Sequence, residues 1–524
     1  MIPEGRGPSN GARGAELRPP DRPGKLRDPQ MTEIRLLRIQ TELIQTSTST
    51  TTMSRLSSAP FRSPLTPRCG RSNLCHAPSE ARQQDRHRVR PWIAQGYKQF
   101  LGADEPLLED PFCNPKHPVN VHFSDVSAAA YNIRGGIRRT PCTRSNQLSK
   151  LLGLDLFLKK EYLQVTGSFK ERGARYAMLR IPENERPKGV VAASAGNHAL
   201  ALCHHGKQLG IPVTVVMPVF APLMKISCCR AYGANVIVKG RNIQESKGYA
   251  LKLGDEHGMR YINGFDHPDV VAGQGTIGLE ILDQIDNLDA AVIPVGGGGL
   301  IAGMALALKT LKPEIKIIGV EAESCPSFQN AMTEGSLATT SCGSGSLADG
   351  LAVPTVGCNA VATAKGLIDK MVTVDEQSIA LAILRLIEME KAIVEGAGAV
   401  GLAAMMSGKL PELKSKRVVN ILTGGNIDTT VLGRIIERGL AIDGRLIRFD
   451  VLVSDRPGGV AQLTTVIAEL GASIKYIFNE RAWVTTDMFS VRCKIVAEAR
   501  DAEHVKQIEA GLKKRYNQVN FKFI

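Results

Sequence analysis

The hexapeptide Ser168-Phe169-Lys170-Glu171-Arg172-Gly173 is the stretch that decides the fold. Its lysine follows an aromatic residue in a Thr-Gly-Ser turn, shortly after the apolar, strand-like run at 154–158. Three further motifs follow in the chain, namely Ser194-Ala195-Gly196-Asn197-His198, Gly296-Gly297-Gly298-Gly299-Leu300 and Thr423-Gly424-Gly425-Asn426. A lysine hexapeptide alone is weak evidence, so the interpretation depends on all four motifs together.

A lysine, a polar loop, a glycine loop and a hydroxyl turn, in that order, are the parts needed to hold pyridoxal phosphate. Together they resemble the serine/threonine dehydratases of the tryptophan-synthase-β superfamily, over roughly residues 120–440. The resemblance implies an α/β fold of type II with two parallel-sheet subdomains. It also implies pyridoxal 5'-phosphate as the cofactor and a small amino acid as the substrate.

Lys170 is the candidate catalytic residue, because a Schiff base requires a neutral amine and desolvation lowers the pKa of a lysine. A surface lysine would be the usual interpretation of an isolated Lys. The flanking Ser168, Phe169, Arg172 and Gly173 favour the cofactor lysine instead. In the resembling family, the residue at Phe169 packs behind the pyridine ring.

Gly296, Gly297, Gly298 and Gly299 stand between a strand-like run and a helical one that begins near Leu300. Without side chains, backbone N–H groups can approach a phosphate, and a helix N-terminus adds positive potential. The loop matches neither of the two common nucleotide-binding glycine motifs. The other motifs therefore favour the phosphate of pyridoxal phosphate.

By resemblance, Asn197 hydrogen-bonds the phenolic oxygen of the cofactor. Ser194, together with its neighbours Ala195 and His198, matches the site for the substrate carboxylate. The same loop also reads as a polar turn that caps a helix. Both functions can hold at once, since a helix N-terminus attracts a carboxylate.

Two positions depart from relatives in informative ways. Thr423 aligns with the hydroxyl or thiol that faces the pyridine nitrogen, where most relatives have Ser or Cys. A neutral hydroxyl does not hold that nitrogen protonated, which suits elimination of a β-substituent. Ala195 stands where related serine racemases have a serine acid/base, and alanine cannot transfer a proton. Both positions indicate elimination rather than racemisation.

Some relatives bind a divalent cation after the strand that ends near Val320. Glu321 matches their first carboxylate, but the second falls near Ser327, which is a poor ligand for a hard cation. We therefore expect no metal site.

Composition adds limits on location and partners. Net charge is +14 over 524 residues, and residues 1–90 alone carry 16 Lys/Arg and 8 Asp/Glu. Residues 1–110 are rich in Pro, Gly, Ser, Thr and Arg, which predicts a disordered basic extension. It lacks aromatic interleaving, so we expect no nucleic-acid partner. Residues 53–79 would suit a transit peptide, so a cytoplasmic location is expected with a mitochondrial one as the alternative.

The eleven cysteines form no C-x-x-C pair, which predicts neither a zinc site nor a disulfide framework. A reduced intracellular compartment fits best. Residues 290–308 are uncharged over nearly the length of a membrane span, but Pro294 and four glycines interrupt them. We expect a strand, a loop and a helix there, and no membrane partner.

Residues 111–440 alternate β-like runs with helical patterns, as a parallel α/β sheet requires. The runs are continuous and β-branched, which is typical of strands buried on both faces. The expected strands begin near residues 154, 189, 213, 235, 291, 315 and 417.

Residues 446–524 differ in character and predict a βαββα pattern that resembles an α+β ACT-like regulatory domain. Its turn contains Asp455, Arg456, Gly458 and Gly459, whose backbone N–H groups precede a helix and suit the carboxylate of an amino-acid effector. The resembling domains pair across subunits, so a homo-oligomer is expected.

These features predict an L-threonine/L-serine ammonia-lyase that depends on pyridoxal phosphate. Two alternatives remain open from the sequence. One is a synthase that adds a nucleophile at the β-carbon. The other is a catalytically silent amino-acid sensor, which the intact Lys170 disfavours.

Overall fold

The computed structural model describes residues 108–522, except 344 and 486. The predicted basic extension at 1–110 therefore lies almost entirely outside the described residues. The larger sheet is parallel apart from the antiparallel edge strand β1. Its strands, in spatial order, are β1 (Cys142–Arg144), β2 (Asp155–Lys160), β10 (Arg417–Leu422), β7 (Ala290–Pro294), β8 (Lys316–Ala322) and β9 (Lys370–Val374).

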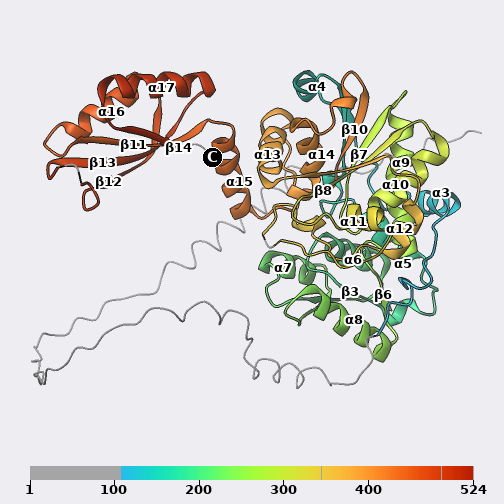
Figure 1. Ribbon diagram of the computed structural model, residues 1–524. Helices are drawn as coiled ribbons and strands as arrows, with labels where there is room; N and C mark the ends of the chain where they lie inside the picture. The colour runs from blue at the N-terminus through green and yellow to red at the C-terminus, as the bar shows by residue number, and fades with distance from the viewer. Residues whose placement is uncertain (1–107, 344, 486, 523–524) are drawn as a thin grey trace, which may run out of the picture. The chain divides into compact units, whose positions relative to one another are not determined.

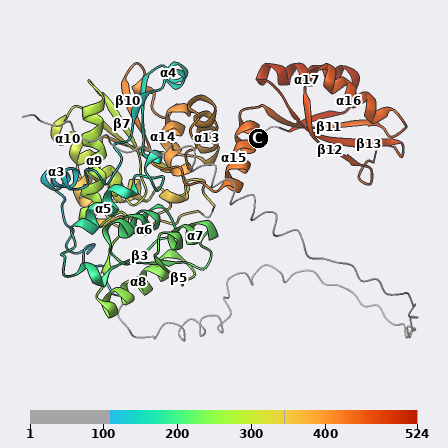
Figure 2. The same ribbon diagram turned by 180° about the vertical axis from the view of Figure 1, so that it is seen from behind.

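Both faces of this sheet are buried, as the β-branched runs predict. Along β7, Ala290 and Val292 pack into one hydrophobic core, whereas Ala291 and Ile293 pack into the other. The first core lies under α4 (Asn146–Leu152), α13 (Glu376–Glu390) and α14 (Gly396–Met406). The second lies under α3 (Phe123–Asn132), α9 (Pro268–Gln284), α10 (Gly299–Leu311) and α12 (Cys358–Ala364). The two helical layers are visible in Figure 1 and, from behind, in Figure 2.

The smaller sheet is entirely parallel. Its strands, in spatial order, are β5 (Asn235–Val238), β4 (Val213–Met217), β3 (Val190–Ala193) and β6 (Arg260–Tyr261). One face packs against α5 (Lys170–Leu179), α6 (Asn197–Leu209) and α7 (Leu223–Ala231), and the other against α8 (Ile243–His257). Two parallel-sheet subdomains were predicted, and the structure confirms them, together with all seven expected strands.

The C-terminal segment builds its own antiparallel sheet, in the order β12-β13-β11-β14. Its elements in chain order are β11 (Leu446–Ser454), α16 (Gly459–Glu469), β12 (Ser473–Glu480), β13 (Ser490–Glu498), α17 (Ala502–Arg515) and β14 (Val519–Lys522). The sequence pattern missed β14, a four-residue strand near the end of the chain. It is fixed by tertiary contacts, because the Phe521 ring stacks on Phe449 at 4.9 Å.

The sequence indicated no disulfide framework, and this prediction was wrong at one place. Cys325 and Cys342 are bonded, with their Cα atoms 4.4 Å apart. Neither spacing nor a motif marked the pair, since the two residues meet only through the path of the chain after β8.

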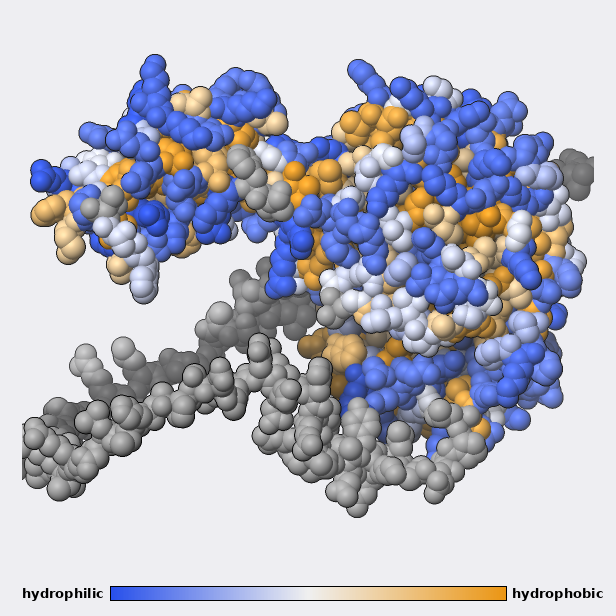
Figure 3. Space-filling model, viewed as in Figure 1, coloured by the Kyte–Doolittle hydropathy of each residue, from blue (hydrophilic) through white to orange (hydrophobic). Residues whose placement is uncertain are grey.

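Residues 290–308 form β7, a loop and most of α10, as expected. Within the described part of the chain, no helix has the length and apolar character needed to cross a membrane. In Figure 3, blue polar side chains on the visible face are interspersed with smaller orange areas. Such a mixture is ordinary for a folded protein.

Candidate active site

The cofactor lysine predicted from the sequence lies at the first position of α5. The Nζ of Lys170 donates a hydrogen bond to the carbonyl oxygen of Gly264 at 2.5 Å. Burial lowers the pKa of this amine to about 8, and the nearby carboxyl of Glu395 acts in the opposite direction. A larger fraction of the amine is therefore neutral near pH 7 than for an exposed lysine, as nucleophilic chemistry requires.

Arg172, in the first turn of α5, anchors this helix through buried ion pairs. Its fully buried guanidinium donates to both oxygens of Glu161, at 2.7 and 2.9 Å, and to Glu280, at 2.7 and 2.8 Å. Glu280 also binds the buried Lys159 at 2.6 Å. Because every charge in this network has a partner, the arginine of the hexapeptide fixes the helix that carries Lys170.

The lysine turn and the hydroxyl turn are joined through their backbones. Phe169 donates its N–H to the carbonyl of Thr423 at 3.0 Å, and Gly425 donates to Gly167 at 3.0 Å. Ser168 and Gly424 form an antiparallel bridge between these two contacts. Thr423 is 3% exposed. The structure thus brings together two motifs that are about 250 residues apart, although the role of Thr423 toward a ring nitrogen stays a prediction.

Asn197 begins α6 and belongs to a hydrogen-bonded group that the sequence identified only in part. Its Nδ2 donates to Oε1 of Glu395 at 2.7 Å, and its Oδ1 accepts from Nδ2 of Asn426 at 2.9 Å. Asn426 also donates to the carbonyl of Thr166, in the lysine turn, at 2.7 Å. These contacts fix the amide orientation of Asn197 and, through Asn426, connect it to the lysine turn.

Glu395 is the titratable residue beside Asn197 that the sequence motifs did not reveal. Burial raises the pKa of its carboxyl to about 7, while Lys225 acts in the opposite direction. The available signal was its position, since Glu395 is the only charged residue in the stretch from Ala392 to Met406. A lone acid in such a stretch is costly unless it is protonated, paired or functional.

The loop at 194–196 connects β3 to α6, as a site at the carboxyl end of a strand requires. The Oγ of Ser194 accepts the N–H of Gly196 at 3.3 Å. His198 is buried, and its Nε2 is 2.9 Å from the carbonyl oxygen of Ile262. Burial and the charge of Lys170 lower the pKa of His198 to about 3, so the ring is neutral. Substrate contacts of Ser194, Ala195 and His198 stay predictions.

The glycine loop lies between β7 and α10, and its first N–H groups precede the helix. Gly298 has a φ of +96°, and a Cβ there would lie 2.3 Å from the ring of Phe328. A Cβ at Gly297 would lie 2.3 Å from the ring of Phe265, and one at Gly299 2.1 Å from the carbonyl oxygen of Phe265. Leu300 is 6% exposed and packs into the adjacent core. Packing therefore excludes side chains from the loop and leaves backbone N–H groups for an anion.

These groups fit pyridoxal phosphate. The amine of Lys170, whose pKa is lowered, can react with the aldehyde. The fixed amide of Asn197 can donate a hydrogen bond to the ring oxygen. The glycine loop, which has no side chains and leads into a helix N-terminus, can bind the phosphate. The residues come from three separate parts of the chain. Their assembly depends on the backbone contacts between the lysine turn and residues 423–425.

Glu321 does not present a free carboxylate to a cation. Its two oxygens accept the N–H groups of Phe328 and Gln329, each at 2.8 Å, and so cap α11 (Ser327–Glu334). Burial raises the pKa of this carboxyl to about 7. The carboxylate that the sequence matched to a metal ligand therefore has a structural partner here.

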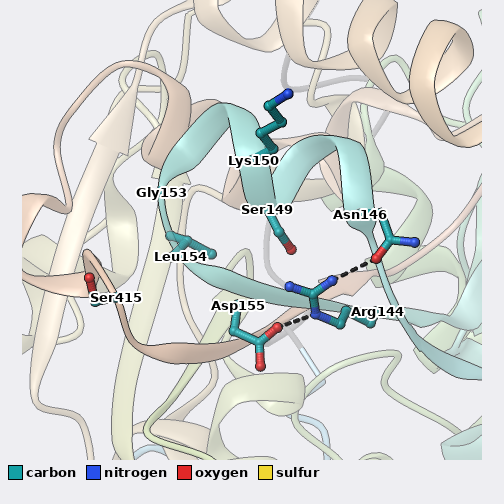
Figure 4. Close-up of a pocket in the computed structure, with 8 residues that line it drawn as sticks. All are labelled: Arg144, Asn146, Ser149, Lys150, Gly153, Leu154, Asp155 and Ser415. Atoms are coloured by element: carbon teal, nitrogen blue, oxygen red, sulfur yellow. Dashed lines mark hydrogen bonds and ion pairs between the residues drawn. The ribbon is translucent and has the colours of Figure 1, made fainter.

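A surface hollow of about 330 Å³ lies elsewhere, between α4 and the start of β2. Figure 4 shows the side chain of Arg144 reaching both Asp155, an ion pair, and Asn146, at 2.6 Å. None of the residues predicted to hold the cofactor lines this hollow. The guanidinium of Arg144 is already paired, and nothing in the hollow connects it to the reaction.

The predicted effector loop precedes α16 in the C-terminal sheet segment. Arg481 donates to both oxygens of Asp455 at 2.7 and 2.8 Å. The N–H groups of Asp455, Arg456 and Gly459 bond Phe489, Ser454 and Arg456 respectively. Gly458, with a φ of +97°, is the N-cap. The loop's own N–H groups are thus largely used, and the free donors are those of the first turn of α16.

Comparisons with known proteins agree with this geometry. The family model described as "Pyridoxal-phosphate dependent enzyme" matches residues 133–424. The chain is 41% identical to the L-threonine ammonia-lyase of Thermotoga maritima over 392 residues, which cover 75% of this chain and 97% of the relative.

Solved structures of related enzymes also resemble this chain. Threonine deaminase isoform 2 of Solanum lycopersicum superposes with a TM-score of 0.58 and 35% identity, covering 64% of this chain and 98% of that one. Serine racemase of Dictyostelium discoideum gives a TM-score of 0.56 and 34% identity, covering 59% and 100%. The family match spans the lysine turn, the asparagine loop, the glycine loop and the hydroxyl turn up to Gly424. This chain therefore belongs to the family of pyridoxal-phosphate dependent enzymes.

Proposed function

We propose that this protein is an L-threonine/L-serine ammonia-lyase. It converts threonine to 2-oxobutanoate and ammonia, and serine to pyruvate and ammonia. The observation that carries the proposal is the similarity to a threonine ammonia-lyase along 97% of that relative's length. The organisation of the site around Lys170 is consistent with this reaction.

Bound pyridoxal phosphate supplies the electron sink that lets a Cα–H bond break and a β-hydroxyl leave. The chain supplies the base. Lys170 has its pKa lowered to about 8 by burial, so its neutral amine can accept the α-proton at Nζ. The carbonyl oxygen of Gly264 then accepts a hydrogen bond from the ammonium, which stabilises the protonated form in place.

The N-terminus of α6 orients the substrate. Ser194 and the following N–H groups lie where a helix N-terminus attracts an anion, which suits the substrate carboxylate. Asn197 is held by Glu395 and Asn426, so its position needs no adjustment when a ligand arrives. Such pre-organisation reduces the entropic cost of reaching the reactive geometry.

Ala195 restricts proton transfer to one face. The methyl group of this residue can neither donate nor accept a proton. Lys170 is then the base on one side of the α-carbon, with no hydroxyl from residue 195 on the other. Elimination requires one base, whereas racemisation requires proton transfer on both faces.

The purified full-length protein, loaded with pyridoxal phosphate, should release one ammonia for each 2-oxobutanoate formed from threonine, without a second substrate. Lys170→Ala should abolish this release and leave the circular dichroism spectrum unchanged. A requirement for an added nucleophile would instead support the synthase alternative. Absence of turnover with a loaded cofactor would support the sensor alternative.

We also propose that residues 446–522 form an ACT-like regulatory module in a homo-oligomer. Its support is the four-stranded antiparallel sheet with α16 and α17, together with the free N–H groups at the start of α16. A branched-chain amino acid is the proposed effector, with its carboxylate at that helix N-terminus.

A further inference from the structure

The disulfide between Cys325 and Cys342 encloses a short segment after β8. Cys325 is 2% exposed, whereas Cys342 is partly exposed and its neighbours Ser341 and Gly343 are exposed. Seven other cysteines in the described residues are free. In a reducing compartment, a disulfide of this kind is usually transient and redox-sensing rather than structural.

On the Cys325 side, the chain leads directly into α11, and this helix packs against the glycine loop. Phe328, three residues further on, is fully buried. Its ring fills the space over Gly298, where a Cβ would come within 2.3 Å of it. The first turn of α11 is held by the two oxygens of Glu321, at 2.8 Å each. Cys325 therefore lies three residues before the ring that packs on Gly298, in one largely buried segment.

On the Cys342 side, the chain leads to a second contact with the same loop. Gly343 donates its N–H to Ser324 at 2.8 Å, which keeps the two cysteines adjacent. The short helical turn Asp349–Leu351 then brings Leu351 against Gly296, where a Cβ would lie 3.0 Å from the Leu351 Cα. The disulfide thus links the segment that packs on Gly298 to a point nine residues before Leu351, which packs on Gly296.

We propose that Cys325 and Cys342 form a reversible redox site that sets how tightly the glycine loop holds the phosphate of pyridoxal phosphate. The bonded state links the two segments covalently, and the reduced state leaves only non-covalent contacts between them, such as the hydrogen bond from Gly343 to Ser324. A restrained loop loses less freedom when it binds an anion, so the bonded state binds the cofactor more tightly. The proposal rests on the cofactor site and not on the proposed reaction.

Hydrogen peroxide is the oxidant class that the site requires. The Cys342 thiolate attacks the peroxide, the O–O bond breaks, and one water leaves after protonation. The Cys325 sulfur then attacks the resulting sulfenic acid, so that the S–S bond forms, the S–O bond breaks and a second water leaves. Two thiols and one peroxide give one disulfide and two waters. A dithiol reductant reverses this by thiol–disulfide exchange.

The test uses the full-length holoenzyme, treated with either hydrogen peroxide or dithiothreitol. Differential alkylation and mass spectrometry should detect the linked 325–342 peptides only after peroxide. The dissociation constant of pyridoxal phosphate, measured by equilibrium dialysis without amino acid, should rise at least about fivefold on reduction, the lower end of typical coupling between sites.

Cys342→Ser should reproduce the reduced affinity and ignore both treatments, whereas the matched variant Cys228→Ser should respond like the wild type. Reduction of the wild-type protein gives an independent result if Cys342→Ser folds poorly. The proposal is overturned if peroxide forms no 325–342 linkage, if dithiothreitol cannot reduce it, or if the two states bind pyridoxal phosphate equally. Because no substrate is present, a failed ammonia-lyase assignment would leave these results unaffected.

Discussion

The Nδ2 amide of Asn197 lies 2.7 Å from Oε1 of Glu395, and this hydrogen bond connects a residue that the motifs reveal to one that they do not. Asn197 begins the helix of the polar loop, and Glu395 immediately precedes α14. Burial lowers the pKa of the Lys170 amine, and Glu395 lies close enough to oppose part of that effect. The protonation state of Glu395 thus affects both sides of the site.

Glu395→Gln should weaken the dependence of stability on pH in the cofactor-free protein. Burial raises the pKa of this carboxyl from 4.5 to about 7. Between these values the unfolded chain releases the proton and the folded chain retains it. The free energy of unfolding therefore falls as pH rises through the window, by about 3 kcal/mol.

Urea denaturation from pH 4.5 to 7.5 would measure this slope. The glutamine variant should lack the contribution, whereas the exposed control Glu183→Gln should keep it. Equal slopes for all three proteins would show that Glu395 is not protonated in the folded state.

The cofactor-free protein should capture pyridoxal phosphate faster as pH rises, with a midpoint near 8. The rate requires the neutral amine of Lys170, whose pKa burial lowers to about 8. Stopped-flow absorbance of the bound cofactor measures this rate. Nα-acetyl-lysine in solution, whose only amine is the ε-amine, supplies the reference with a midpoint near 10. A protein midpoint that coincides with that of Nα-acetyl-lysine would contradict the desolvation argument.

Gly298→Ala should lower both stability and cofactor affinity. The new Cβ would lie 2.3 Å from the Phe328 ring at a φ of +96°, so packing and backbone strain both oppose it. We expect a loss of about 2–4 kcal/mol in the free energy of unfolding. Gly366→Ala is the matched control, since its φ is also positive, at +75°, but nothing lies within 4 Å. Similar losses in both variants would assign the effect to backbone strain alone.

Ala195→Ser should introduce measurable racemase activity. The added hydroxyl would provide a proton donor and acceptor on the second face of the substrate. Chiral chromatography of serine recovered after incubation would detect D-serine. If D-serine does not exceed the wild-type level, residue 195 does not control the stereochemical outcome.

Truncation after residue 445 should remove regulation by branched-chain amino acids and retain turnover. Residues 446–522 have their own hydrophobic core, so the catalytic sheets do not need them to bury apolar surface. Threonine saturation curves with and without isoleucine or valine should differ in the threonine concentration at half-saturation, by roughly 5–150-fold in the full-length protein. A truncated protein that still responds would place the effector site outside residues 446–524.

The sequence predicted the parallel α/β fold class, and its motifs named residues that the structure brings together, although their roles stay predictions. Buried β-branched runs predict parallel strands, and glycines before a helix predict an anion site. Glu395 and the Cys325–Cys342 bond were missed because their meaning depends on which segments become neighbours. Strand β14 was missed for the same reason, since four residues near the chain end carry too little periodicity.

The bridge between Ser168 and Gly424 has a consequence for biosynthesis. A ribosome that has translated the lysine turn must still add about 250 residues before the partner of that turn exists. Strand β10, which lies between β2 and β7 at the centre of the larger sheet, is among the last of the catalytic strands to be translated. Nascent chains therefore lack strand β10 and the backbone contacts that hold the lysine turn until residues 417–425 have emerged. Free pyridoxal phosphate should consequently affect the yield of folded protein only late in elongation, while residues 426–524 are being added, or after chain release.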